Sequence, residues 1–174
     1  KEVEQSLKNS YTYLEYRKLV SDLSEKGEST GPLQTEELAQ YTQLNNSRMR
    51  RWDKTLKFNE EAVAKIKSIK QKIEWVVLDA SPAIPVMYKI TELNPNISLS
   101  LILRDENLNV MNQFLTNGSM SIPKLIAIDE EEVVVSTWGP RSINATKLVE
   151  AYKEEHGKLS PEFKQDLQVF YNKD

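Results

Sequence analysis

The sequence has 174 residues, with 23 lysines and arginines against 26 aspartates and glutamates, and a formal net charge of −3. This length suits one domain with its own core, or a small domain with an appendage. An acidic pI near 5.4 argues against a nucleic-acid partner, because nucleic-acid binders usually carry a basic face. No apolar run approaches the ~20 residues that span a bilayer, so we expect no membrane partner.

The cysteine and histidine counts limit the chemistry of the chain. There is no cysteine, and His156 is the one histidine. These residues therefore cannot form disulfides, thiolate metal sites or a zinc site built from histidines, and we expect no metal and assign no cofactor. The polar start Lys1–Gln5 does not resemble a signal peptide, so we expect a cytoplasmic protein. Because the sequence lacks an initiator methionine, we also expect residues to precede Lys1.

The first 72 residues predict helices. The turn-forming segment 27–32 (GESTGP) separates the first from the second, Thr35 is a candidate cap of the second, and Asn59 is a candidate cap of the third. Apolar residues recur at helical spacing in each segment. They are Val3, Leu7, Tyr11, Leu14, Leu19 and Leu23; Leu38, Tyr41, Leu44, Met49, Trp52 and Leu56; and Val63, Ile66 and Ile69.

The second half alternates between strand and helix patterns. Short β-branched runs predict strands at 73–78, 97–103, 124–129 and 132–137, the last two joined by an acidic turn at 130–131. Helical spacing predicts helices at 84–93, at 108–115 after a cap at Asp105, at 143–152, and from Pro161. The order β-α-β-α-β-β-α implies a parallel βαβ unit extended by an antiparallel hairpin, and hence a mixed sheet.

This order resembles the thioredoxin fold, and two prolines strengthen the resemblance. The segment Ser121-Ile122-Pro123-Lys124-Leu125-Ile126 resembles the thioredoxin segment whose Ile–Pro bond is cis and faces the active-site loop. Pro85 resembles the proline that follows the first cysteine of a thioredoxin motif by eight positions. The resemblance implies a three-layer α/β/α domain with a mixed central sheet at 73–155, preceded by a helical extension at 1–72 and followed by a C-terminal helix or tail at 156–174.

The same resemblance locates a gap in the expected motif. Counting back from Pro85 puts Asp79 at the third motif position counted from the first cysteine, which is the x of Trp-Cys-Gly-x, and Ala80 at the fourth, the position of the second cysteine. The first cysteine would then fall between Leu78 and Asp79, where this sequence has no residue. We prefer the interpretation that a cysteine-bearing loop belongs there; the alternative is a deletion that leaves a redox-inactive thioredoxin fold.

The segments DENLNVMNQFLTNG, SIPKLIAID, TWGPR, YRKL and TGP together resemble a bacterial thioredoxin-like group in which Trp-Cys-Gly-Asp often replaces Cys-x-x-Cys. The resemblance implies a monothiol thiol–disulfide oxidoreductase acting on protein or small-molecule thiols and disulfides. It implies that Ser121, Ile122 and Pro123 bind the substrate, and that Asp79 and Ala80 flank the absent cysteine. For Asp79 we rank capping of the following helix ahead of proton transfer.

Two other functions remain as alternatives. A binding module would use a groove around Ile122, Pro123 and Trp138, or the aromatic residues of the helical extension, Tyr41, Trp52 and Phe58. A glutathione-dependent transferase ranks lower, because its helical domain normally follows the thioredoxin domain, whereas here the helices mostly precede it.

Overall fold

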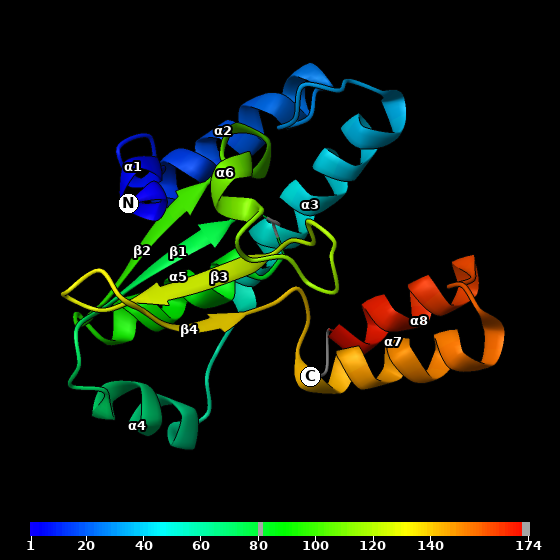
Figure 1. The fold of residues 1–174 in the computed structure, drawn as a ribbon. Coiled ribbons are helices and arrows are strands. Elements are labelled where there is room, and N and C mark those ends of the chain that lie inside the picture. Colours follow the sequence, from blue (N-terminus) through cyan, green and yellow to red (C-terminus); the bar gives the residue numbers. More distant parts are fainter. Residues whose placement is uncertain (80–81, 172–174) are drawn as a thin grey trace. The chain divides into compact units, whose positions relative to one another are not determined.

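The computed structural model describes residues 1–79 and 82–171. By packing, the chain forms two compact units, Lys1–Trp138 and Gly139–Asp174, each described by itself below. The first unit opens with four helices (Figure 1), where the sequence predicts three. They are α1 (Glu2–Leu7), α2 (Tyr13–Lys26), α3 (Glu36–Thr55) and α4 (Glu60–Ser68).

The first unit contains a four-stranded mixed sheet in the order β2-β1-β3-β4. The strands are β1 (Ile73–Leu78), β2 (Ile97–Ile102), β3 (Lys124–Ile128) and β4 (Val134–Trp138). β1 pairs with β2 in parallel and with β3 antiparallel, and β3 pairs with β4 antiparallel. The predicted mixed sheet is confirmed, and β4 starts two residues later than predicted because residues 129–133 form a turn on the carboxylate of Asp129.

Two helical segments connect the strands. α5 (Ile84–Leu93) links β1 to β2, as predicted. The predicted helix at 108–115 is wrong in length, because only a 3-10 turn at Arg104–Glu106 and the single turn α6 (Leu108–Met111) form. The Asp105 carboxylate accepts from Arg104 Nε and caps no helix. Residues 112–121 then follow an irregular path, with φ of 50° at Asn117 and 75° at Gly118.

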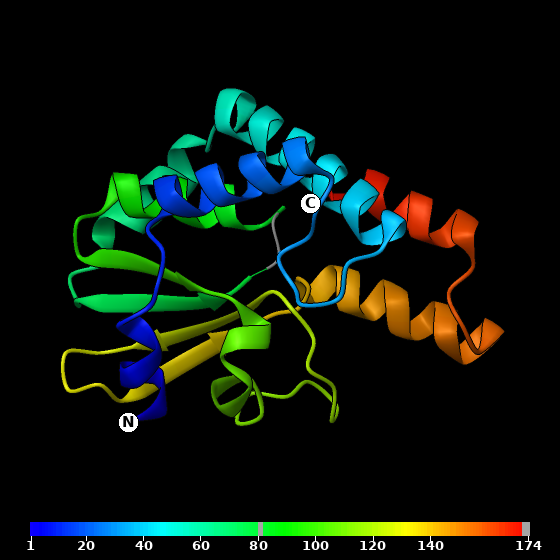
Figure 2. The ribbon, with the colours of Figure 1, turned by 90° about the horizontal axis from the view of Figure 1, so that it is seen from above.

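Helices cover both faces of the sheet in this unit, giving the three layers seen in Figure 2. On one face, α2, α3 and α5 enclose the larger apolar cluster. On the other face, α1 and α6 cover a second cluster (Figure 2). The fully buried side chains of the two clusters include Tyr16, Met49, Val77, Ile84 and Leu101 in the first, and Val76, Leu78, Ile102, Val110 and Ile126 in the second.

Two of the predicted apolar stripes match the observed burial only in part, since Val3, Leu7, Tyr11 and Leu19 pack against the apolar clusters and Met49 is buried. The first helix breaks after Leu7, and α2 restarts at a capping box between Thr12 and Glu15, so Tyr13, Tyr16 and Val20 are buried and Leu14 is exposed. In α3, the buried residues are mostly small or polar, namely Ala39, Thr42, Asn45, Asn46 and Met49, whereas Leu38, Tyr41 and Leu44 are exposed. The mismatch in α2 follows from the new helix start after Thr12, and that in α3 follows from polar contacts with α2 that hydrophobicity alone does not reveal.

The second unit is a pair of helices, α7 (Ile143–His156) and α8 (Pro161–Tyr171). Ser142 caps α7, and Gly157 ends it with φ of 77°. The Tyr152 ring stacks on Phe163 at 3.9 Å between centroids, which joins the two helices.

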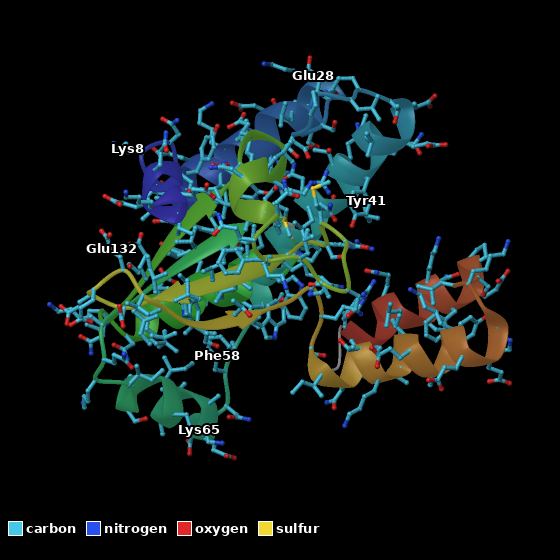
Figure 3. All side chains as sticks on the ribbon, in the orientation of Figure 1. Lys8, Glu28, Tyr41, Phe58, Lys65 and Glu132 are labelled. Carbon is cyan, nitrogen blue, oxygen red and sulfur yellow. The ribbon has the colours of Figure 1, made fainter. Side chains whose placement is uncertain are left out.

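The exterior of the chain carries many charged side chains. Lys8, Glu28, Lys65 and Glu132 project away from their elements (Figure 3), and all four are exposed. None of the helices in the described part of the chain is both long enough and apolar enough to cross a bilayer.

Candidate functional site at the carboxyl end of β1

Asp79 lies where β1 ends, among residues from several parts of the first unit. Its backbone N–H donates to the carbonyl of Ile102, at 3.1 Å, so the chain continues beside the end of β2. The carboxyl ends of neighbouring parallel strands are where α/β folds collect functional side chains. Here the ends of β1 and β2 set Asp79 beside Arg104.

The Asp79 side chain is buried, with 7% of its surface exposed, and is surrounded by donors. Its Oδ1 accepts from the backbone N–H of Arg104 at 3.2 Å, and its Oδ2 accepts from the Tyr16 hydroxyl at 3.3 Å. The Thr30 hydroxyl lies 3.5 Å from the same Oδ2. These donors favour the carboxylate, but burial outweighs them and raises the pKa of Asp79 above its usual range, with the nearby charge of Asp105 adding to the rise.

Asp79 does not cap the following helix, which corrects our preferred role for it. The N-cap of α5 is Ala83, which makes no side-chain capping bond, and Pro85 occupies the first turn. The Asp79 carboxyl instead accepts from Arg104 and Tyr16. Asp79 lies four residues before the N-cap and therefore does not occupy the capping position. Ala80, which we predicted to flank the cysteine, lies outside the described residues.

The predicted proline segment lies next to Asp79 on the neighbouring strand. The Ile122–Pro123 bond is cis, as predicted. Leu78 pairs with Lys124 in the antiparallel register of β1 and β3, so Asp79 and Pro123 are the next residues on these two strands. Ser121 and Ile122 are half-buried just before them, and the Ser121 N–H donates to the Ser119 carbonyl at 2.8 Å. The strand register therefore sets Pro123 opposite Asp79, with Ser121 and Ile122 directly before Pro123 in the chain.

Lys124 adds a buried amine beside this segment. Its Nζ donates to the Thr116 hydroxyl at 2.7 Å, and burial lowers the pKa of the ammonium. Because its backbone pairs with Leu78, Lys124 lies at the same end of the sheet as Asp79.

The loop between α2 and α3 closes against the segment after β2. A Cβ built on Gly31 would lie 2.7 Å from Asp105 Oδ2, closer than van der Waals contact allows. The other carboxylate oxygen of Asp105 accepts from Arg104 Nε at 2.8 Å. A side chain at position 31 would therefore require the Asp105 carboxylate to shift.

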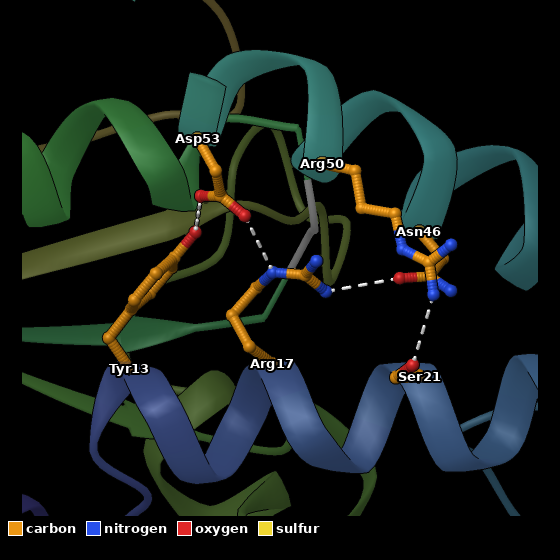
Figure 4. A network of polar contacts seen from close by, with 6 residues as sticks. All are labelled: Tyr13, Arg17, Ser21, Asn46, Arg50 and Asp53. Carbon is orange, nitrogen blue, oxygen red and sulfur yellow. Dashed lines mark hydrogen bonds and ion pairs between the residues drawn. The ribbon is translucent and has the colours of Figure 1, made fainter.

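Polar contacts hold α2 and α3 together and so fix the helix that carries Tyr16 (Figure 4). Arg17 Nε donates to Asp53 Oδ2 at 3.0 Å, and Arg17 Nη1 donates to Asn46 Oδ1 at 3.1 Å. The Tyr13 hydroxyl donates to the other oxygen of Asp53, and Arg50 donates to Ser21 Oγ. Burial, followed by the bond to Asp53, raises the pKa of Tyr13.

A separate cavity of about 450 Å³ lies at the opposite, amino end of β1. Lys72, Glu74, Phe114 and Asp129 are among its lining residues, and neither Asp79 nor Pro123 is. Across residues 1–79 and 82–171, no group of three or more histidine, aspartate or glutamate side chains is arranged to hold a metal ion.

The sequence did not identify Tyr16, Thr30, Arg104 or Lys124 as site residues. Thr30 belongs to the TGP segment, which we interpreted only as a helix break and a family feature. Tyr16 lies on the buried face of α2 together with Tyr13 and Val20. A sequence prediction that started this helix at Tyr13 would have placed the three residues on one face.

Comparisons with known proteins agree with this architecture. Residues 31–153 match a thioredoxin family model. A crystal structure of a protein of unknown function from Pseudomonas aeruginosa is similar, with a TM-score of 0.54 and 17% identity, over 83% of this chain and 88% of that one. An HIV epitope scaffold also has a TM-score of 0.54, at 15% identity, over 78% of this chain and 81% of that one.

These two structures share the fold, and no curated protein matches the chain. The family model covers well over half of the sequence, including β1, the cis-proline segment and all four strands. The chain therefore belongs to the thioredoxin family.

Proposed function

We propose that the protein is a bacterial, cytoplasmic monothiol thiol–disulfide oxidoreductase whose cysteine belongs to a loop between Leu78 and Asp79. One observation carries the proposal. The register of β1 and β3 sets the cis Ile122–Pro123 segment beside Asp79 at the carboxyl end of β1, where α5 begins a few residues later. In this proposal residues 73–155 carry the chemistry, 1–72 form a helical extension and 156–174 a C-terminal appendage.

The chemistry follows from this placement. The nucleophilic form of the proposed cysteine is its thiolate, which nearby positive charge favours. The thiolate attacks one sulfur of a substrate disulfide, forming a mixed disulfide and releasing the other sulfur as a thiolate. Ser121, Ile122 and Pro123 are the proposed substrate-binding segment, because their backbone borders this position.

Release of the product needs a further thiol. In this proposal Ala80 stands at the position of the second cysteine, so the mixed disulfide is resolved by an external thiol or by a cysteine elsewhere. The external route runs as two exchanges. An external thiolate attacks the protein's sulfur in the mixed disulfide, releases the reduced substrate and leaves a new mixed disulfide. A second external thiol then returns the protein's cysteine to the thiolate and leaves as a disulfide.

The alternative is a redox-inactive binding module, favoured by the absence of any cysteine from the sequence. Alkylation of the purified full-length protein, followed by intact mass and peptide mapping, separates the two. We expect one alkylated cysteine in a peptide between Leu78 and Asp79. Direct linkage of these two residues with no reactive thiol would contradict the oxidoreductase and leave the binding module.

A further inference from the structure

The Asp79 carboxyl is held largely by residues from outside the strand-and-helix core that follows residue 72. Of the three donors to it among residues 1–79 and 82–171, only the Arg104 N–H comes from that core. The Tyr16 hydroxyl comes from α2, and the Thr30 hydroxyl comes from the loop between α2 and α3. A buried carboxyl without donors is costly, so these contacts decide how the group is oriented and how easily it ionises.

The chain neighbours of Tyr16 and Thr30 contact other elements of the fold. Tyr13, one turn before Tyr16, stacks on Tyr88 of α5 at 4.1 Å between centroids. Arg17, next to Tyr16, forms an ion pair with Asp53 of α3 (Figure 4). Gly31, next to Thr30, lies against Asp105. Tyr16 and Thr30 are therefore each followed in the chain by a residue that contacts another element.

We infer that the helical extension is a functional part of the site, with Tyr16 and Thr30 as positioning residues that orient the Asp79 carboxyl and control its ionisation. The consequence for catalysis rests on the proposed function, because the proposed cysteine would precede Asp79 by two positions. The charge of a carboxyl that close affects the stability of a thiolate. The extension would then tune the reactivity of the site without touching the substrate.

The other groups that face Asp79 are compatible with this role. Arg104 favours the charged carboxylate and Asp105 opposes it, and the two are paired with each other at 2.8 Å. Removing the Tyr16 hydroxyl leaves this pair in place, so a change in the Asp79 pKa would report the loss of the hydroxyl.

The test is a carbon-13 NMR titration of the Asp79 carboxyl in the full-length protein, assigned with Asp79→Asn. In Tyr16→Phe we expect an upward shift of the Asp79 pKa, because a donor to the carboxylate is lost. In Thr30→Val we expect a smaller upward shift, since its distance is longer, and Thr30→Ser should restore the original titration. Tyr13→Phe is the matched control: it removes a hydroxyl from the same helix that bonds Asp53, and the Asp79 pKa should stay unchanged.

An Asp79 titration in Tyr16→Phe that superimposes on that of Tyr13→Phe overturns the inference. If Tyr16→Phe does not fold, identical titrations in Thr30→Val and Thr30→Ser overturn it. The titration needs no cysteine, so it is independent of the alkylation experiment. A missing thiol would contradict the proposed function alone, and an unchanged titration would contradict the positioning role alone.

Discussion

Tyr13 stacks on Tyr88 with 4.1 Å between ring centroids and 11° between ring planes. Tyr13 belongs to α2 and Tyr88 to α5, so this pair joins the helical extension to the helix that follows β1. Both rings pack in the apolar cluster that also holds Tyr16 and Met49. The extension therefore shares a core with the sheet and is part of the same folded unit.

Replacing Tyr88 by leucine should lower the free energy of unfolding by about 0.5–1.5 kcal/mol, because the leucine retains apolar volume but loses the ring stack. Urea denaturation followed by circular dichroism measures the change. Tyr88→Phe keeps the ring and is the control, expected to lie within about 0.5 kcal/mol of the original protein. Equal losses in both variants would show that the stack contributes nothing.

Asp53→Ala should destabilise the protein by about 1–3 kcal/mol, because Arg17 and Tyr13 both lose their acceptor in a partly buried setting. A double-mutant cycle with Arg17→Met isolates the ion pair, and the double variant should lose less stability than the sum of the two single losses. Asp22→Ala removes the exposed pair with Lys18 on the same helix α2 and should change nothing measurable. If the stability losses of Asp53→Ala and Arg17→Met simply add in the double variant, the contact between these residues is contradicted.

Gly31→Ala should destabilise the protein by up to about 1 kcal/mol, because the new methyl group displaces the partly exposed Asp105 carboxylate from its pair with Arg104. The cause can be tested directly in an Asp105→Ala background, where the blocking oxygen is gone and Gly31→Ala should become close to neutral. Thermal or urea unfolding of the four proteins gives the comparison. A loss that persists without the Asp105 carboxylate would mean that the backbone, and not this contact, requires glycine.

The stability of the protein should depend on pH through Asp79. Because its pKa in the folded state lies above the ordinary value of 3.8, the folded protein binds this proton more tightly than the unfolded chain does. The contribution of Asp79 is therefore fully present below pH 3.8 and is lost as the pH rises through the folded pKa.

Asp79→Asn removes this dependence, so its free energy of unfolding relative to the original protein should increase as the pH rises from 4 to 8. Urea denaturation at a series of pH values measures the difference. Asp166→Asn, which removes an exposed charge from α8, controls for net charge and should show no such trend. A difference between Asp79→Asn and the original protein that is constant with pH would contradict the raised pKa.

The local patterns of the sequence were enough to determine most elements and the topology. Runs of β-branched residues located β1 to β3 within a residue, and Thr35 and Asn59 cap α3 and α4 as predicted. Pro123 was identified together with its cis bond through the resemblance to thioredoxins. These features depend on side-chain spacing and backbone preference, which are properties of short segments.

The contacts around Asp79 depended on the tertiary structure. Tyr16 and Thr30 are 63 and 49 positions away from Asp79 in the chain, and the YRKL and TGP segments that contain them gave no indication of a contact with it. The buried face of α3 was predicted wrongly for the same reason, since Asn46 and Asp53 are inward because Arg17 and Tyr13 on α2 bond them. The sequence by itself determined the strands, the helix caps and the family. Only the packing of α2 and α3 against the sheet decided which polar groups are buried together. The reason is that hydrogen bonds between distant segments form only once hydrophobic burial has brought those segments into contact.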